Sequence, residues 1–404
     1  MYNQSQINTF TFVIIFFYTF VNMGQTIQLY DSILKEYDSF KEVNLSGRYL
    51  SEESLLNVIH NLSKTITTKK EGISEEGRPI FSLEIGRGSN KILIWSQMHG
   101  NETTTTKAVF DVLNYFSYDL VVTDVILKNC KLLIIPVLNP DGAFAYTRVN
   151  SNGIDLNRDA TAQTQSESKV LQRVYHEFQP SFCLNMHDQR TIFSAGSSNH
   201  PATVSFLSPA YNTQRDINQA REVSMSLIAK ANKVLQQFIP NQVGRYDDSF
   251  NINCIGDYFQ QKGTPTVLFE AGHFAHDYER EQTRRFICIA LLEMLTAVAN
   301  NDIEASTQEY FSIPENEKLF YDLIIRGATA EDKSVDLAVQ YTEVLTNKQI
   351  QFLPIIEKIG DLSSYYGHRE VSANQLLFQL KPSTLLKEGE VLKEFLLNDK
   401  VIVV

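Results

Sequence analysis

Four side chains in this 404-residue chain could together hold and use a metal ion. His99 and Glu102 lie three residues apart just after an apolar run, and His187 and Glu270 end two other apolar runs. Short apolar runs of this kind are typical of buried strands, and ligands in open α/β sheets lie at the carboxyl ends of the strands. We therefore expect these four side chains to meet at one edge of a sheet.

The residue types in this set indicate hydrolytic zinc chemistry. A His-x-x-Glu pair alone is a weak signal, because a chain with 8 histidines and 47 acidic residues is expected to contain one by chance. Two imidazoles, one carboxylate and an open coordination position together form a usual hydrolytic zinc site. We assign His99, Glu102 and His187 as the ligands of one Zn2+ ion per chain. Glu270 is then the general acid/base that takes a proton from the water activated by the zinc.

Two arginines, Arg148 and Arg158, flank a loop rich in glycine and asparagine. A guanidinium presents a planar fork of donors that fits a carboxylate or an oxyanion. The same two residues could instead form surface salt bridges, and their types alone do not decide between these interpretations.

The chemistry-bearing residues need a sheet that brings strand ends together. Apolar runs alternate with amphipathic segments, which is typical of a mostly parallel sheet covered by helices on both faces. We therefore expect an α/β fold with a mixed, mostly parallel central sheet. The expected strands are Lys91–Trp95, Lys131–Val137, Phe182–Met186, Val204–Leu207 and Thr266–Glu270, and the expected helices are 28–66, 102–118, 162–178, 214–238 and 279–299.

The pattern changes beyond residue 302 to short apolar runs separated by polar turns. This pattern predicts a small, mainly β module. We expect a catalytic domain over 25–303 and a C-terminal β-rich domain over 304–404, with 1–24 a signal peptide or a segment outside the domains. The expected C-terminal strands are Leu319–Ile325, Val335–Val339, Gln351–Ile356, Gln375–Leu380 and Val401–Val404.

Charge and the N-terminal segment limit the partners and the location. The formal net charge of −11 argues against a nucleic-acid partner, which needs a basic face. Residues 10–21 are apolar but too short for a comfortable membrane span, so no stable span is expected. They are long enough for a signal-peptide core, yet residues 1–9 contain no Lys or Arg. We favour a cytoplasmic location, with secretion or a periplasmic location as the alternative if 1–24 are a signal peptide.

Five short motifs, in this order along the chain, resemble those of the zinc carboxypeptidase family, the metallocarboxypeptidases related to the pancreatic enzymes. The resemblance covers roughly residues 75–300 and implies that family's fold and its zinc-dependent cleavage of peptides at the C-terminus. Each motif alone is weak, but the ordered set is specific. The motifs are His99-Gly100-Asn101-Glu102, Asn139-Pro140-Asp141-Gly142, Asp155-Leu156-Asn157-Arg158, His187 and Phe269-Glu270.

The resemblance also implies roles for residues around the metal ligands. Asp155 looks like the carboxylate that orients a liganding imidazole. Asn157 and Arg158 look like the clamp for the terminal carboxylate of the substrate. Arg148 would polarise the scissile carbonyl and stabilise the oxyanion, and Tyr246 is the nearest candidate for the family's mobile tyrosine.

The chain departs from the digestive enzymes in two places. His187 is followed by Asp188 and Gln189 rather than by an aromatic-bearing segment, and no inhibitory pro-domain is evident, so the chain is more similar to short, bacterial-type members. Residues 250–258 are expected to line the specificity pocket, but the sequence does not show which of Ile255, Asp257 and Tyr258 faces it.

The leading hypothesis is a metallocarboxypeptidase that acts on peptides with a free C-terminal carboxylate. A zinc amidohydrolase of the same fold, acting on N-acyl amino acids or cell-wall peptides, remains an alternative. A zinc-binding module without activity is a third hypothesis, although Glu270 and all three ligand positions are present.

Overall fold

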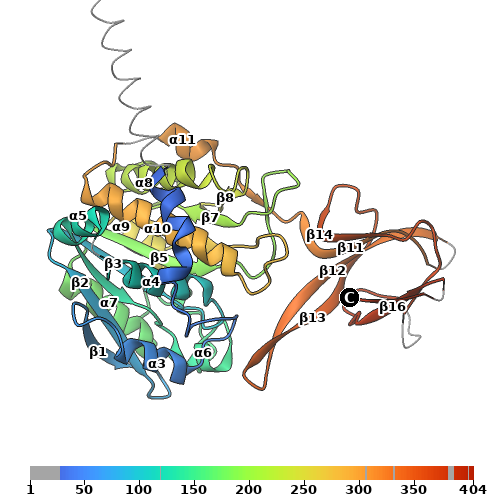
Figure 1. Ribbon diagram of the computed structural model, residues 1–404, viewed down its shortest axis with the longest axis horizontal. Coiled ribbons are helices and arrows are strands. Elements are labelled where there is room, and N and C mark those ends of the chain that lie inside the picture. The colour runs from blue at the N-terminus through green and yellow to red at the C-terminus, as the bar shows by residue number, and fades with distance from the viewer. Residues whose placement is uncertain (1–27, 119, 305–306, 331–332, 381–385, 399) are drawn as a thin grey trace, which may run out of the picture.

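The computed structural model describes residues 28–118, 120–304, 307–330, 333–380, 386–398 and 400–404 (Figure 1). Its elements form an α/β part and a β-rich C-terminal module, which lie side by side (Figure 1). The domain boundary expected at 303/304 stays a prediction. The helix Thr307–Ser312, which follows it, still packs on the α/β part through Tyr310. The N-terminal segment 1–24 lies outside the described residues. Among the residues that the structure describes, no helix is long and apolar enough to span a membrane.

A mixed eight-stranded sheet forms the centre of the α/β part. Its strands are β1 (Thr67–Ile73), β2 (Pro79–Gly86), β3 (Asn90–Ser96), β4 (Cys130–Ile135), β5 (Phe182–Asp188), β7 (Val204–Leu207), β8 (Val243–Arg245) and β9 (Thr266–Ala271). They lie in the order β1-β2-β4-β3-β5-β9-β7-β8. The four central strands, β4, β3, β5 and β9, are parallel to one another. Strand β2 pairs antiparallel with β4, and β7 pairs antiparallel with β9. The predicted fold class is confirmed.

Helices cover both faces of this sheet (Figure 1). Their bounds are α2 (Tyr37–Phe40), α3 (Glu52–His60), α4 (Thr104–Tyr115), α5 (Val121–Asn129), α6 (Pro140–Ala145), α7 (Ser166–Phe178), α8 (Gln219–Leu235), α9 (Ile255–Gln261), α10 (Glu281–Ala299) and α11 (Thr307–Ser312). Successive strand side chains point to opposite faces. Ile92 and Ile94 of β3 therefore pack with α4, α8 and α10, while Leu93 and Trp95 pack with α7 and α9.

The prediction of a single helix over 28–66 is wrong. The chain instead forms three short helical segments, at 28–35, α2 and α3, with non-helical residues between them. The prediction also missed β1 and β2. The strand β1 is mostly exposed and rich in Thr and Lys, so it has no apolar alternation that sequence could reveal. It is held by its antiparallel pairing with β2, a contact that local sequence does not show.

The C-terminal module contains two sheets that face each other across an apolar core. Its strands are β11 (Phe320–Ala330), β12 (Lys333–Thr346), β13 (Gln349–Gly360), β14 (Tyr366–Ser372), β15 (Phe378–Leu380), β16 (Glu394–Leu397) and β17 (Lys400–Val403). The four-stranded sheet has the order β13-β12-β11-β14 and the three-stranded sheet the order β15-β16-β17. A short strand β10 (Asn316–Glu317) pairs with β6 (Ser194–Ala195) and connects the module to the α/β part.

The loop between β3 and α4 packs against the turn that begins α6. A Cβ atom built on Gly100 would lie 1.8 Å from the backbone carbonyl carbon of Gly142. The side chain of Asn139 holds the same contact by donating from Nδ2 to the carbonyl of Met98 at 3.1 Å. The loop that carries His99 therefore has room for glycine alone at position 100.

Gly100→Ala should displace this loop and lower the free energy of unfolding by about 1–3 kcal/mol, as overpacked sites do. Gly263→Ala is the control: Gly263 has a φ of +86° but nothing within 4 Å of a built Cβ, so it tests backbone strain without a clash. Denaturant unfolding and a zinc titration of both variants check this. Unchanged zinc affinity in Gly100→Ala would contradict the steric argument.

Candidate metal centre

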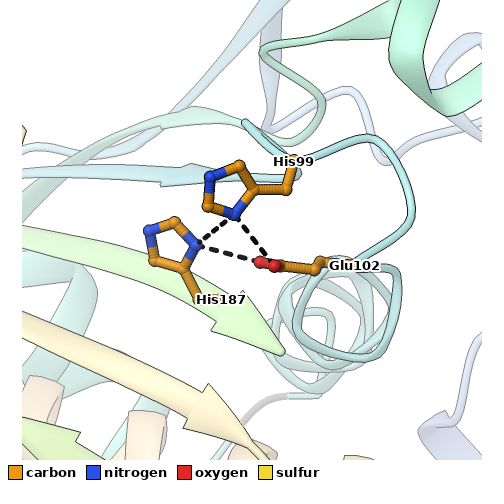
Figure 2. Close-up of side chains that lie close together, drawn as sticks. All are labelled: His99, Glu102 and His187. Carbon is orange, nitrogen blue, oxygen red and sulfur yellow. Dashed lines mark hydrogen bonds and ion pairs between the residues drawn. The ribbon is translucent and has the colours of Figure 1, made fainter. Parts of the chain in front are cut away.

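His99, Glu102 and His187 converge on one point at the carboxyl edge of the sheet (Figure 2). Nδ1 of His99 lies 2.8 Å from Oε1 of Glu102, and Nδ1 of His187 lies 2.9 Å from Oε2 of the same carboxylate. The two Nδ1 atoms are 3.1 Å apart. All three residues are at most 2% exposed. The sequence placed these residues at strand ends, and the structure brings them together.

The donor set of this cluster fits a zinc ion. Nε2 of His99 lies 3.0 Å from Oδ1 of Asp155. If Nε2 carries the proton of the neutral ring and donates it to Asp155, the lone pair of Nδ1 faces the centre of the cluster. Two imidazole nitrogens and one buried carboxylate form a usual ligand set for hydrolytic zinc. Burial raises the pKa of Glu102, but the charges and hydrogen bonds of His99 and His187 outweigh it and hold that pKa below its ordinary value.

The helix α4 begins directly after the loop of residues 99–103, called the ligand loop below. Backbone N–H groups at the start of α4 are free to hold neighbouring groups in place. The carboxylate of Asp188 accepts from the backbone N–H groups of Thr104 and Thr105 at 2.8 and 3.1 Å. Asp188 follows His187 in β5, so the second histidine is tied to the start of the helix behind Glu102. A carboxylate at a helix N-terminus also interacts favourably with the helix dipole. Sequence reasoning noticed Asp188 only as a departure from the family and gave it no role.

Glu270 lies beside the metal cluster because β5 and β9 pair in parallel with His187 opposite Glu270. The side chain lines the same cleft as the three cluster residues. Burial, together with the nearby carboxylates of Glu102 and Asp188, raises the pKa of Glu270 well above its ordinary value. The structure therefore places a carboxylate of raised basicity next to the cluster.

The loop after α6 brings Asp155 and Arg148 to the cluster. Nε and Nη2 of Arg148 lie 3.1 and 3.0 Å from Oδ2 of Asp155, and Nη1 lies 3.6 Å from Oε1 of Glu102. Burial raises the pKa of Asp155, but His99 and Arg148 outweigh burial and hold it well below its ordinary value. Asp155 therefore stays ionised and connects the arginine to the liganding imidazole.

Asn157 and Arg158 lie in a short 3-10 turn over Leu156–Arg158. Oδ1 of Asn157 accepts from the backbone N–H of Ile255 at 3.1 Å, so this side chain fixes the start of α9. The side chain of Arg158 is exposed on the cleft and donates to the carbonyl of Asn157 at 2.9 Å. The structure thus gives Asn157 a contact that the sequence did not indicate.

Tyr246 follows β8 and lines the cleft, with its ring 5.5 Å from that of Phe193 in an edge-on contact. Its backbone N–H donates to the carbonyl of Phe206 at 2.9 Å, which continues the pairing of β7 and β8. Burial raises the pKa of the Tyr246 hydroxyl, and Glu270 and Glu102 add to this rise. The hydroxyl is therefore a neutral donor on the wall of the cleft.

The structure decides which residue of α9 faces the cleft. Ile255 is 3% exposed and packs in the core with Trp95, whereas Asp257 lines the cleft. Burial raises the pKa of Asp257 to about 7. Asn185 of β5 also lines the cleft, and both polar atoms of its buried side-chain amide are without hydrogen-bond partners in the described part of the chain. The wall formed by these two residues can accept hydrogen bonds.

The cleft as a whole has a volume of about 310 Å³. Besides the residues above, its lining includes residues that the sequence did not indicate, since no short motif carries them: Arg190, Leu207, Pro209 and Leu268.

Comparisons with known proteins agree with this architecture. Residues 52–242 match the family model described as zinc carboxypeptidase. Carboxypeptidase 2 of Trichophyton tonsurans is 27% identical over 173 residues, which are 39% of this chain and 31% of that protein. Carboxypeptidase B of Astacus astacus is 34% identical over 79 residues, which are 19% of this chain and 26% of that protein. The matches thus span about a third or less of these relatives.

Solved carboxypeptidase structures share the fold of the α/β part. Carboxypeptidase A from Helicoverpa armigera matches with a TM-score of 0.50 and 18% identity, over 70% of this chain and 82% of that one. A metallo-carboxypeptidase from Burkholderia cenocepacia matches with a TM-score of 0.50 and 16% identity, over 63% of this chain and 70% of that one. The family model, the relatives and this shared fold confirm the resemblance of the chain to the zinc carboxypeptidase family.

Proposed function

We propose that this protein hydrolyses the C-terminal peptide bond of peptides, with one zinc ion per chain. The observation that carries the proposal is the buried cluster of His99, Glu102 and His187 with Glu270 beside it in one cleft. Two arginines, Arg148 and Arg158, line the same cleft and would bind the oxygens of the substrate.

His99, Glu102 and His187 would hold the zinc. When bound, a zinc ion supplies a Lewis acid and lowers the pKa of water for attack on the carbonyl. Glu270 would accept the proton of the attacking water and deliver it to the leaving amine, a task that suits its raised pKa. Arg148, close to Glu102 and Asp155, would donate to the carbonyl oxygen as negative charge develops on it.

The other end of the cleft would select a free C-terminus. Arg158 presents its exposed guanidinium there and would pair with the terminal carboxylate, while Tyr246 would close the wall around it. Asn157 would act mainly by holding α9, whose Asp257 would contact the side chain of the C-terminal residue of the substrate.

We also propose a cytoplasmic location, because residues 1–9 carry no Lys or Arg.

Glu270→Gln should reduce kcat by about 100- to 10,000-fold, since it removes the proton-transferring group. Zinc binding should persist, because Glu270 does not belong to the ligand cluster. Zinc content by mass spectrometry and peptide turnover are measured on the same preparation. Glu279→Gln, at an exposed position, is the control, and full turnover in Glu270→Gln would exclude the proposed mechanism.

Arg158→Met should raise KM for a peptide with a free C-terminus about 10- to 100-fold, because it removes charge-assisted hydrogen bonds to the carboxylate. The wild type should cleave the same peptide poorly when its C-terminus is amidated. Arg173→Met, which removes a surface arginine paired with Glu71 and Glu177, is the control. Equal cleavage of the acid and the amide by the wild type would favour the amidohydrolase alternative. Bound zinc without hydrolysis of any peptide would indicate a module without activity.

Asp257 should make the choice of C-terminal residue depend on pH. Its carboxyl is neutral below its pKa of about 7 and ionised above it, so a cationic side chain gains an attractive charge as the pH rises. The ratio of kcat/KM for two peptides that differ only in ending with Lys or Leu should rise roughly tenfold from pH 6 to pH 8, following the ionised fraction. Asp257→Asn should make this ratio independent of pH. A pH-independent ratio in the wild type would show that Asp257 does not contact the C-terminal side chain.

A further inference from the structure

The C-terminal module inserts one buried carboxylate into the α/β part. Glu343 stands on β12, in the long β12–β13 hairpin of the C-terminal module (Figure 1). Its side chain is 6% exposed. One oxygen lies 2.8 Å from Nη2 of Arg48, and the other lies 2.6 Å from Nη2 of Arg190 and accepts from the hydroxyl of Tyr146. All three partners belong to the α/β part.

Both arginines that Glu343 holds reach the loop of the metal ligands. Nη1 of Arg190 donates to the backbone carbonyl of Asn101 at 2.8 Å, and Asn101 stands between His99 and Glu102. The carbonyl of Arg48 accepts from Oγ1 of Thr103 at 2.8 Å, at the other end of the same loop. Two short paths of contacts therefore lead from the C-terminal module to the metal cluster.

Arg190 also takes part in the cleft itself. It lies three residues after His187 and lines the cleft, with its side chain 26% exposed. A guanidinium carries five N–H donors, and the contacts to Glu343 and Asn101 use only part of them. The remaining donors are available to a peptide in the cleft.

The buried guanidinium groups around Glu343 need a negative charge beside them. Arg48 and Arg280 are at most 2% exposed, and Arg190 lies close to them. Burial raises the pKa of Glu343, but the positive charges of Arg48, Arg190 and Arg280 outweigh burial and lower that pKa to about 2. Without this carboxylate the guanidinium groups would be buried with less compensation, which is costly, and would repel one another.

A second buried carboxylate at the same interface, Asp322, is not paired directly with either arginine. Asp322 of β11 is 1% exposed and accepts from the hydroxyl of Tyr278, the side chain of Gln340 and the backbone of Tyr341. Asp322 reaches Arg48 indirectly, through Tyr278, whose backbone carbonyl accepts from Nη1 of Arg48 at 3.2 Å. Of these two carboxylates in the described part of the chain, Glu343 is the one that pairs directly with Arg48 and Arg190.

We propose that Glu343 is a positioning residue through which the C-terminal module completes the active site, by fixing Arg190 at the cleft and the ligand loop in its metal-binding shape. The part of this proposal that concerns turnover rests on the proposed function, whereas the part that concerns the metal does not. The α/β part without the C-terminal module would accordingly contain every catalytic group and still lack the group that aligns them.

The test compares Glu343→Gln with Asp322→Asn in the full chain. Zinc affinity is measured by competition with a chromophoric chelator, kcat and KM with a peptide that has a free C-terminus, and stability by thermal unfolding. Glu343→Gln should weaken zinc binding about 10- to 100-fold, as loss of outer groups around a metal site does, and should lower kcat/KM. Asp322→Asn should leave zinc affinity and kcat/KM within about twofold, whatever it does to stability.

The possible results distinguish the positioning role of Glu343 from the proposed peptidase function. Equal zinc affinity in Glu343→Gln and the wild type, or equal losses in both variants, would overturn the positioning role. Weakened zinc binding in Glu343→Gln alone supports it, even if the wild type cleaves no peptide, an outcome that would count against the proposed function only. If Glu343→Gln does not fold, Glu343→Asp takes its place with the same expectations, because it keeps the charge but draws it back from both arginines.

Discussion

The carboxylate of Glu102, buried between the imidazoles of His99 and His187, is the interaction on which the rest of this structure depends. Burying an ionised group without partners is very costly. Oε2 accepts from the backbone N–H of Asp188, and each oxygen lies 2.8–2.9 Å from a ring nitrogen of His99 or His187, where a bound cation would compensate the charge. The surrounding groups hold these three side chains close together.

Successive layers of charge surround the cluster. Asp155 holds His99 and is itself held by Arg148. Asp188 holds the start of α4 and lies 3.8 Å from Arg280. The guanidinium of Arg280 donates to the carbonyl of Ala271, next to Glu270, and to that of Gln189, just after β5. Each carboxylate thus has a cation or several N–H groups next to it, which keeps the local charge balanced.

Much of the fold could be predicted from sequence because its signals are local. The runs that form β3, β5 and β9 are largely apolar and carry polar residues at or near their carboxyl ends, so both the strands and their polar ends were evident. The strands β14 and β16 and the helix α5 were not predicted. The strand β14 pairs in parallel with β11 and exposes Arg369 and Glu370, so its pattern resembles that of a loop.

The sequence by itself determined the residue types of the His99, Glu102 and His187 cluster, the strand ends near which they stand and the alternation of strands and helices, because each of these is carried by a few neighbouring residues. Only the tertiary structure decided that Asp257 rather than Ile255 faces the cleft, that Asn157 fixes α9, and that Glu343 lies behind the ligand loop. The chain contains 47 acidic residues, and nothing in the neighbours of Glu343 indicates that its partners lie some 150 to 300 residues earlier. Contacts over such separations are set by how the two parts pack against each other, and the same local pattern is compatible with many such arrangements.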